Sequence, residues 1–358
     1  MLHLVKKSWP YVAVFVIGGF IGWLLPNPSP LSTGQIINVR GDLLRQDDSG
    51  YNLIAPLLAC DIGSEQAFPE LIPLKSLLTD LVNQKINTGK AQHISIYVRS
   101  LKGARWLEIN GSNTYAPASL LKVFVMMAYY KEADDTDNPA LLQEQVAFDG
   151  SANPSADTPG EIIPHLQSGK LYTIDQVINQ MIIYSDNDAL NTLVNHFDTQ
   201  TLNEFQLAFK DLSIPSPVTQ SESTLNFMSV DNYAMVFRVL YGSTYLPARY
   251  SERALELLSQ VQYTNGIVAG VPQGIAVAHK FGVSTIPANG STLAANELHD
   301  CGIVYYPNHP YLLCVMTQGQ SFADLQQTIV NISGATYQWL DGYYKSFPAS
   351  AASTTLAK

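Results

Sequence analysis

The sequence of 358 residues lacks several features that would indicate a function directly. It has no internal repeat and no glycine-rich phosphate loop, so neither a repeat architecture nor that mode of nucleotide binding is indicated. No group of histidines, cysteines or carboxylates has the spacing of metal ligands, and no cofactor is expected. The net charge is −10, with 20 basic against 30 acidic side chains, which argues against nucleic acid as a partner.

One uncharged apolar run is long enough to suggest a membrane segment. Two lysines precede residues 9–25, and three prolines follow before residue 31. The run is at the short end for a membrane helix, and the core of a signal peptide would be similar. No Ala-x-Ala cleavage site is evident, and Trp9, Tyr11 and Trp23 suit the two membrane interfaces. We therefore expect an uncleaved single-pass anchor in the cell membrane, with the rest of the chain exported.

The remaining length fits one catalytic domain. We expect a signal anchor over residues 1–30, a polar connector over 31–75, a domain over 76–345 and an Ala/Ser/Thr-rich tail over 346–358. A domain of that size can bury a normal single core.

Cysteine is scarce, with three residues in all. Cys60 follows Leu-Leu-Ala, as in a lipoprotein processing site, but the basic and long apolar regions that should come directly before it are missing, so we interpret it as structural. Cys301 and Cys314 lie on consecutive predicted strands. Either a disulfide in an exported domain or two separate buried thiols would fit this arrangement.

The first motif with chemical content is Ser-Leu-Leu-Lys at residues 119–122. The apolar stretch 120–130 predicts a buried helix, which places Ser119 in its first turn. Lys122 lies three residues on, so its amine is on the same helix face as the hydroxyl. A desolvated lysine can take the proton of a serine and so activate it as a nucleophile. A serine that serves only as the N-cap of the helix, with an unrelated lysine, is the alternative.

Two further motifs follow in the chain. Ser185, Asp186 and Asn187 interrupt two apolar helical segments, either as an ordinary turn or as a loop that carries polar groups to a cleft. Val-Ala-His-Lys-Phe-Gly at 277–282 predicts a strand that ends in Lys280 and a glycine that lets a ligand approach the backbone. Read alone, Lys280 could equally be a lysine whose ammonium reaches the surface.

Taken in order, Ser-x-x-Lys, Ser-Asp-Asn and Lys-x-Gly resemble the class A β-lactamases and the related penicillin-binding D,D-peptidases. The resemblance covers roughly residues 76–343. It implies an α+β fold: a five-stranded antiparallel sheet flanked by terminal helices, with an all-helical subdomain inserted between strands two and three. Here the membrane helix would precede it. The expected elements are helices at 74–85 and 322–343, and strands at 94–101, at 105–109 and around Lys280, Ile303 and Leu312.

The resemblance also implies roles for individual residues. Ser119 would be the acylated nucleophile, Lys122 the base or proton relay, and Ser185 the proton donor to the leaving nitrogen. Asn187 would bind the substrate amide, and Lys280 its carboxylate. In addition, Gly282 would allow close approach, and the backbone N–H groups of Ser119 and Val283 would form an oxyanion hole. Asp186 is expected to hold its own loop.

The sequence departs from this family at position 281. Phe281 stands where Thr or Ser is usual, so a hydroxyl that normally helps to hold the substrate carboxylate is missing. His279 is also atypical, and we interpret it as a structural or tuning residue.

A second departure concerns deacylation. Glu222 begins Glu-Ser-Thr-Leu-Asn, which matches the Glu-x-x-Leu-Asn motif that positions the hydrolytic water in class A enzymes. However, the next helix is predicted to start almost at once after this motif, and an exposed loop glutamate is the alternative.

Three functions therefore remain open. The first is a membrane-anchored serine hydrolase of the class A β-lactamase type, which cleaves a β-lactam or related amide through an acyl-serine intermediate. The second is a D,D-peptidase, or penicillin-binding protein, that acts on peptidoglycan peptides. The third is a catalytically dead surface module of the same fold, which Phe281 and the shortened loop make conceivable.

Overall fold

The computed structural model describes residues 52–54, 68–103, 105–150, 165–216, 226–286 and 295–346. Their centre is a five-stranded sheet in the order β2 (Trp106–Ile109), β1 (His93–Ser100), β7 (Tyr311–Gly319), β6 (Ala295–Val304) and β5 (Val277–Ile286). Every neighbouring pair is antiparallel. The predicted five-stranded antiparallel sheet is thus confirmed, and β5, which carries Lys280, is an edge strand.

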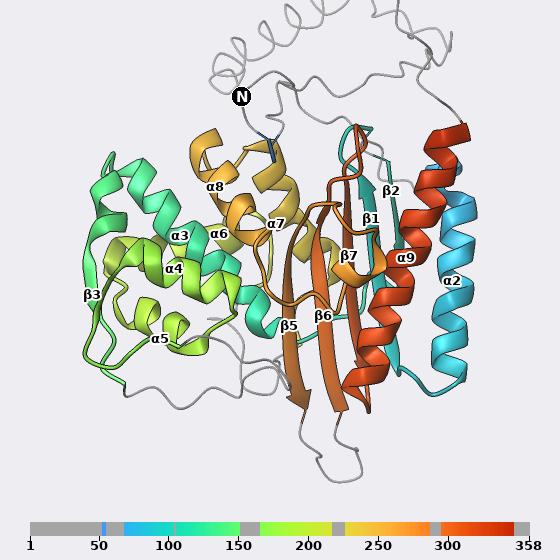
Figure 1. Ribbon diagram of the computed structural model, residues 1–358, viewed down its shortest axis with the longest axis horizontal. Coiled ribbons are helices and arrows are strands. Elements are labelled where there is room, and N and C mark those ends of the chain that lie inside the picture. The colour runs from blue at the N-terminus through green and yellow to red at the C-terminus, as the bar shows by residue number, and fades with distance from the viewer. Residues whose placement is uncertain are drawn as a thin grey trace, which may run out of the picture. The chain divides into compact units, whose positions relative to one another are not determined.

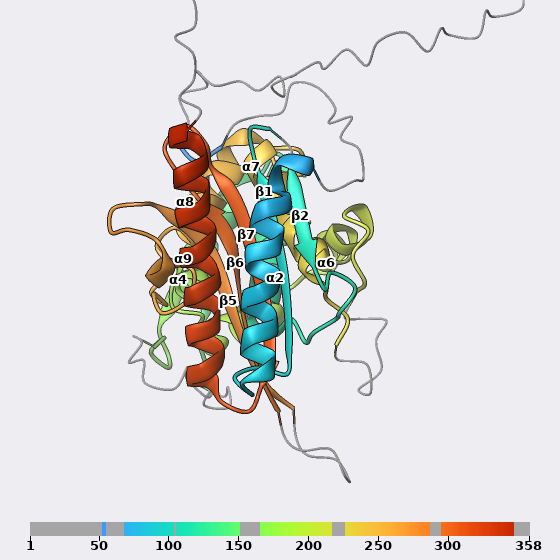
Figure 2. The same ribbon diagram turned by 90° about the vertical axis from the view of Figure 1, so that its right-hand side faces the viewer.

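Two helices cover one face of this sheet. They are the first and last long helices described, α2 (Ile72–Asn87) and α9 (Phe322–Ser346), and they lie side by side in Figure 2. Leu74, Leu78 and Val82 recur at four-residue spacing on α2 and are buried, which gives the helix one apolar face toward the sheet. α2 begins before residue 76, where we expected the domain to start. A short 3₁₀ turn, η1 (Pro69–Leu71), leads into it.

The other face meets a helical subdomain whose elements lie between β2 and β5 in the chain (Figure 1). Its helices are α3 (Lys122–Asp135), α4 (Ile174–Ile183), α5 (Asn187–Asn195), α6 (Thr199–Asp211), α7 (Val230–Gly242) and α8 (Ala248–Leu258), with 3₁₀ turns at η2 (Ala118–Leu121) and η3 (Pro139–Gln143). The turn η6 (Val268–Gly270) also precedes β5 in the chain, but it packs against α9. All residues from Lys122 to Tyr130 are buried. A helix that is apolar on nearly every side belongs at the centre of a core, and α3 takes that place.

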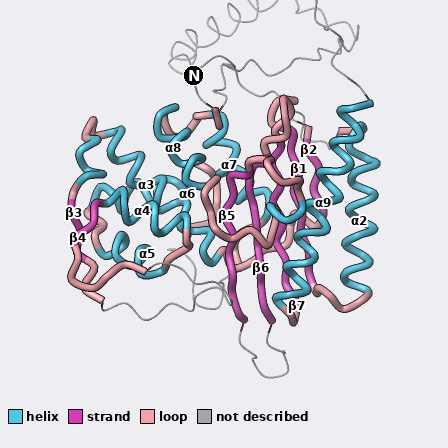
Figure 3. The backbone as a smooth tube through the Cα atoms, in the orientation of Figure 1, coloured by secondary structure: helices cyan, strands magenta, loops and turns pink. Residues whose placement is uncertain are grey.

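The expectation of an all-helical insertion was wrong in one detail. Strands β3 (Gln145–Ala147) and β4 (Leu171–Thr173) form a separate two-stranded antiparallel sheet at the edge of the subdomain (Figure 3). Each has three residues, too few for a period-two pattern to be visible in the sequence. β4 leads directly into α4, where Thr173 forms a capping box with Gln176, as its position predicts for an N-cap residue.

Cys301 and Cys314 form a disulfide between β6 and β7. They are register partners on adjacent strands and are fully buried. Of the two arrangements left open by the sequence, the structure contains the disulfide.

Part of the expected connector is held by the domain. Glu252 on α8 accepts hydrogen bonds from the backbone N–H groups of Asn52, Leu53 and Ile54 at 2.9–3.1 Å, and Tyr305 Oη donates to the oxygen of Leu53. None of the helices within the described ranges is long and apolar enough to cross a membrane. The predicted anchor at residues 9–25, the tail from residue 347 and Cys60 lie outside the described residues.

Candidate active site

Ser119 lies in η2, between α3 and the edge strand β5. The turn before α3 is 3₁₀ rather than α-helical, so Ser119 precedes the helix that we expected it to begin. Tyr233 Oη donates to the oxygen of Leu120 at 3.0 Å and fixes the turn from α7. Ala118 has φ of 48°, in the left-handed region that side chains rarely adopt. Backbone strain held by surrounding contacts is common at functional turns.

Lys122 brings two of the three motifs together. Its Nζ donates to Ser119 Oγ at 2.9 Å, to Asn187 Oδ1 at 2.6 Å and to the backbone oxygen of Ser185 at 2.5 Å. A longer contact of 3.3 Å reaches Ser185 Oγ. The amine therefore contacts both serine hydroxyls, as a proton relay between them requires.

Burial sets the charge state of this lysine. Lys122 is fully buried, and desolvation lowers the pKa of its amine from 10.5 to about 7. The nearby Asp186 carboxylate acts in the opposite direction and raises that pKa. A large fraction of the amine is therefore neutral near neutral pH, and only the neutral form can accept a proton from a hydroxyl.

The turn between α4 and α5 presents Ser185. Its φ of 58° lies in the left-handed region. Directly after it, Asp186 Oδ1 accepts from the N–H groups of Asp188 at 2.8 Å and Ala189 at 3.3 Å, while Gln180 Nε2 donates to Oδ2 at 2.9 Å. Asp186 is fully buried and caps α5. This confirms that Asp186 holds its own loop and thereby supports Ser185.

Lys280 completes the polar centre from the opposite side. Its Nζ donates to Ser185 Oγ at 2.8 Å and to the oxygen of Phe281 at 3.1 Å. The ammonium also lies 4.2 Å from the centroid of the Phe281 ring, a cation–π contact. That ring is buried and stacks on Tyr263 with centroids 4.3 Å apart. Position 281 therefore offers an aromatic ring packed on Tyr263 and no hydroxyl.

Gly282 lets β5 approach the nucleophile turn. A Cβ at this position would lie 2.8 Å from the oxygen of Pro117 and 3.1 Å from Cγ of Leu120. Only glycine avoids these contacts without moving the strand or the turn. The next residue, Val283, pairs with Leu298 on β6, so its backbone position is fixed by the sheet.

Glu222 lies outside the described residues, so its place relative to Ser119 stays a prediction. The described chain resumes at Asn226, the last residue of the Glu-x-x-Leu-Asn motif. Asn226 Nδ2 donates to Glu297 Oε1 at 3.4 Å. Ser229 then caps α7, which confirms that the next helix follows the motif closely.

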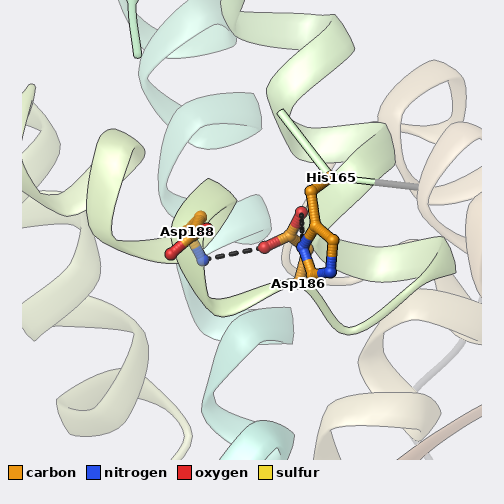
Figure 4. Close-up of side chains that lie close together, drawn as sticks. All are labelled: His165, Asp186 and Asp188. Atoms are coloured by element: carbon orange, nitrogen blue, oxygen red, sulfur yellow. Dashed lines mark hydrogen bonds and ion pairs between the residues drawn. The ribbon is translucent and has the colours of Figure 1, made fainter. Parts of the chain in front are cut away.

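The structure also assembles a group that the sequence spacing did not reveal. Ligand atoms of His165, Asp186 and Asp188 lie within 4.8 Å of one another beside the α4–α5 turn (Figure 4). A metal ion there would have to share Asp186 with the N–H donors of the helix cap and with Gln180. Because these donors already bind both carboxylate oxygens, the cap explains the buried aspartate by itself.

Sequence reasoning missed several residues around the site. Tyr263 packs on Phe281, and Asp300 Oδ1 bonds to His279 Nδ1 at 2.8 Å, while its Oδ2 accepts from the N–H of Ile267 at 2.8 Å. Both His279 and Asp300 are buried, which fits the interpretation of His279 as structural. The one signal in the sequence was the presence of charged residues inside an otherwise apolar strand at 295–304.

Comparison with known proteins identifies the family. A model of the beta-lactamase enzyme family matches residues 73–340. The chain belongs to the beta-lactamase enzyme family. No curated protein sequence matches the chain significantly.

Several solved structures share the fold at low sequence identity. A mutant of PBP-A, in an acyl-enzyme complex with penicillin G, has 20% identity and a TM-score of 0.58, over 75% of this chain and 97% of its own. A beta-lactamase from Sphaerobacter thermophilus has 21% identity and a TM-score of 0.59, over 74% and 96%. A class A beta-lactamase from Bacteroides cellulosilyticus has 16% and 0.61, over 75% and 98%.

Proposed function

We propose that this protein is a serine hydrolase of the class A β-lactamase type that opens a β-lactam or a related amide. The single observation that best supports it is the fully buried Lys122, whose amine has a pKa of about 7 and bonds to Ser119 Oγ at 2.9 Å. Burying a lysine amine costs free energy of folding, so a fully buried lysine indicates that a function requires it there. A neutral amine beside a serine hydroxyl is the arrangement that activates a nucleophile.

The acylation step uses the hydrogen bonds of this site. Neutral Lys122 accepts the proton of Ser119 Oγ while that oxygen attacks the carbonyl carbon of the substrate. The C–N bond then breaks, and Ser185 donates a proton to the leaving nitrogen and recovers one from Lys122, which it contacts at 3.3 Å. Lys280 stabilises negative charge on Ser185 and on the substrate. The N–H groups of Ser119 and Val283 stabilise the oxyanion.

Deacylation needs a water molecule that attacks the ester and returns the proton to Ser119. We assign the positioning of that water to Glu222. If Glu222 does not reach the site, the acyl-enzyme persists, and the protein behaves as a penicillin-binding D,D-peptidase. If Phe281 abolishes substrate binding, it is a catalytically dead module.

Intact mass spectrometry of the purified full-length protein with penicillin G distinguishes these outcomes. We expect an adduct of drug mass that appears, then disappears as hydrolysed drug accumulates, and that is absent in Ser119→Ala. An adduct that persists would indicate the peptidase-type alternative. No adduct and no hydrolysis would contradict the proposal. Glu222→Gln should trap the adduct, whereas an unchanged time course would remove Glu222 from the mechanism.

We also propose that residues 9–25 anchor the protein in the cell membrane with the catalytic domain exported. The support is the sequence pattern of two lysines, an uncharged run and interfacial aromatics. Membrane fractionation, followed by protease treatment from the outside, should find the domain in the membrane fraction and accessible. Release of the domain into the soluble fraction without its N-terminus would show that the segment is a cleaved signal peptide.

A further inference from the structure

Two fully buried side chains on β6 have no part in the proposed chemistry. Glu297 and His299 are two residues apart and therefore on the same face of the strand. Both point toward the segment that leads into η2. Glu297 Oε2 accepts from the N–H of Ala116 at 3.1 Å, and His299 Nε2 lies 3.1 Å from the oxygen of Ala116.

The hydrogen bonds of His299 define its tautomer. The N–H of Thr317 lies 3.4 Å from His299 Nδ1 and can only donate, so Nδ1 is the acceptor. The hydrogen is then on Nε2, which donates to the oxygen of Ala116. The ring of Tyr115 packs edge-on against the imidazole, with centroids 5.2 Å apart, and holds its plane.

Together the two side chains replace a missing strand partner. The N–H and oxygen of Tyr115 pair with the backbone of Met228 in an isolated bridge. Ala116, the next residue, directs both its backbone groups to side chains instead, the N–H to Glu297 and the oxygen to His299. Every backbone polar group of these two residues is thereby satisfied, which a segment beside a buried strand requires.

The hydrogen bonds from Glu297 and His299 to Ala116, called the grip on Ala116 below, lie close to the nucleophile. Ala116 is three residues before Ser119, and the intervening Pro117 is the residue whose oxygen limits the approach of Gly282. The spacing between η2 and β5 therefore depends on where β6 holds Ala116. In the proposed mechanism the two oxyanion donors, Ser119 and Val283, lie on these two elements.

We infer that Glu297 and His299 are positioning residues that set the distance between Ser119 and β5, and with it the geometry of the oxyanion hole. The inference rests on the proposed acyl-serine mechanism. Glu297 also accepts from Asn226 at 3.4 Å and from Gln318 at 3.5 Å, so the carboxylate that grips Ala116 is itself fixed from two sides. A misplacement of about 1 Å can cost about 100-fold in rate.

The test uses variants of the full-length protein. Glu297→Ala and His299→Ala should reduce the acylation rate with penicillin G by about 10- to 100-fold. They should weaken inhibition by phenylboronic acid, which forms a tetrahedral adduct with serine, by a similar factor. His299→Gln places an N–H donor within reach of the oxygen of Ala116 and should restore most of both losses. Glu256→Ala and His196→Ala, at exposed positions, are the matched controls and should change neither.

Two outcomes would overturn the inference. If the alanine variants fold and acylate at the wild-type rate, it is wrong. If His299→Gln melts like the wild type yet stays as slow as His299→Ala, a hydrogen bond to Ala116 is not the cause, and the inference is again wrong. If Glu297→Ala does not fold, the two His299 variants decide alone.

Failure of the proposed function can be distinguished from failure of this inference. The wild-type protein would then form no Ser119-dependent adduct. In that case hydrogen exchange of the peptide over residues 115–121 still tests the grip. Protection lost in His299→Ala and regained in His299→Gln would establish the grip as structural and overturn its catalytic part.

Discussion

At the scale of single residues, Lys122 determines how the activity depends on pH. Its amine has a pKa lowered to about 7 by burial, and only the unprotonated form accepts a proton from Ser119. We expect the acylation rate to rise between pH 6 and pH 8 and then to level off. Stopped-flow measurement of acylation across this range checks the prediction. A rate independent of pH in this range would mean that another group is the base.

The lowered pKa of Lys122 also makes the free energy of unfolding depend on pH. The amine binds a proton with a pKa near 7 when folded and near 10.5 when unfolded, so the unfolded chain carries more protons between these values. The free energy of unfolding should therefore rise with pH in this window, by up to about 1.4 kcal/mol per pH unit from this group alone. Below pH 7 both states are protonated and the slope vanishes. Denaturant unfolding should show this slope as the difference between the wild type and Lys122→Met.

Gly282 is a second residue at which one added atom should change both stability and activity. In Gly282→Ala the new Cβ would meet the oxygen of Pro117 at 2.8 Å and push β5 away from η2. We expect a loss of about 1–3 kcal/mol of stability and a loss of acylation of at least 10-fold. Gly342→Ala is the control, because that position on α9 has nothing within 4 Å and alanine should stabilise the helix by about 1 kcal/mol. Equal acylation rates in the two variants would contradict this account.

At the scale of elements, the α4–α5 turn joins two helices and also adjusts the base. Asp186 caps α5 and raises the pKa of Lys122 through its charge. In Asp186→Asn the carboxamide oxygen can still cap the helix, but the charge is gone. The rise of the acylation rate should then move to lower pH, with a change in melting temperature of only a few degrees. An unmoved pH profile would show that Asp186 acts through the cap alone.

The strands of the sheet were accessible to sequence reasoning, but the side chains that each strand directs to either face were not. Strand patterns predicted β1, β2, β5, β6 and β7. However, they did not show that Glu297 and His299 on β6 contact Ala116 from one face of the sheet, while Asp300 on the opposite face bonds to His279. A buried charge in a strand can be read as unusual in a sequence, but its partner can be found only in three dimensions.

At the scale of the whole molecule, the disulfide gives a testable statement about all three cysteines. Cys301 and Cys314 are bonded to each other, so of the three cysteines only Cys60 takes no part in this disulfide. Alkylation of the denatured protein should add one label before reduction and three after it. In the chain-entropy model, closing the loop between Cys301 and Cys314 stabilises the folded protein by about 3 kcal/mol. Three labels without reduction would contradict the bond.

The sequence by itself determined the chemistry that is available. The order of Ser119, Lys122, Ser185 and Lys280 along the chain, each at the boundary of an apolar element, was enough to predict the family and the fold around them. Local spacing decides which side chains share a helix turn, as Ser119 and Lys122 do. The cap at Thr173 is local in the same way, because capping depends on a few neighbouring residues.

Only the tertiary structure decided how these groups act on one another. The approach of Lys122 to Ser185 and Asn187 spans more than sixty residues of chain. The stacking of Phe281 on Tyr263 and the grip of β6 on Ala116 likewise join distant segments. The pKa of Lys122 belongs to the same class, because desolvation depends on everything packed around the amine. Such properties depend on contacts between segments that are distant in the sequence, so no local sequence pattern predicts them.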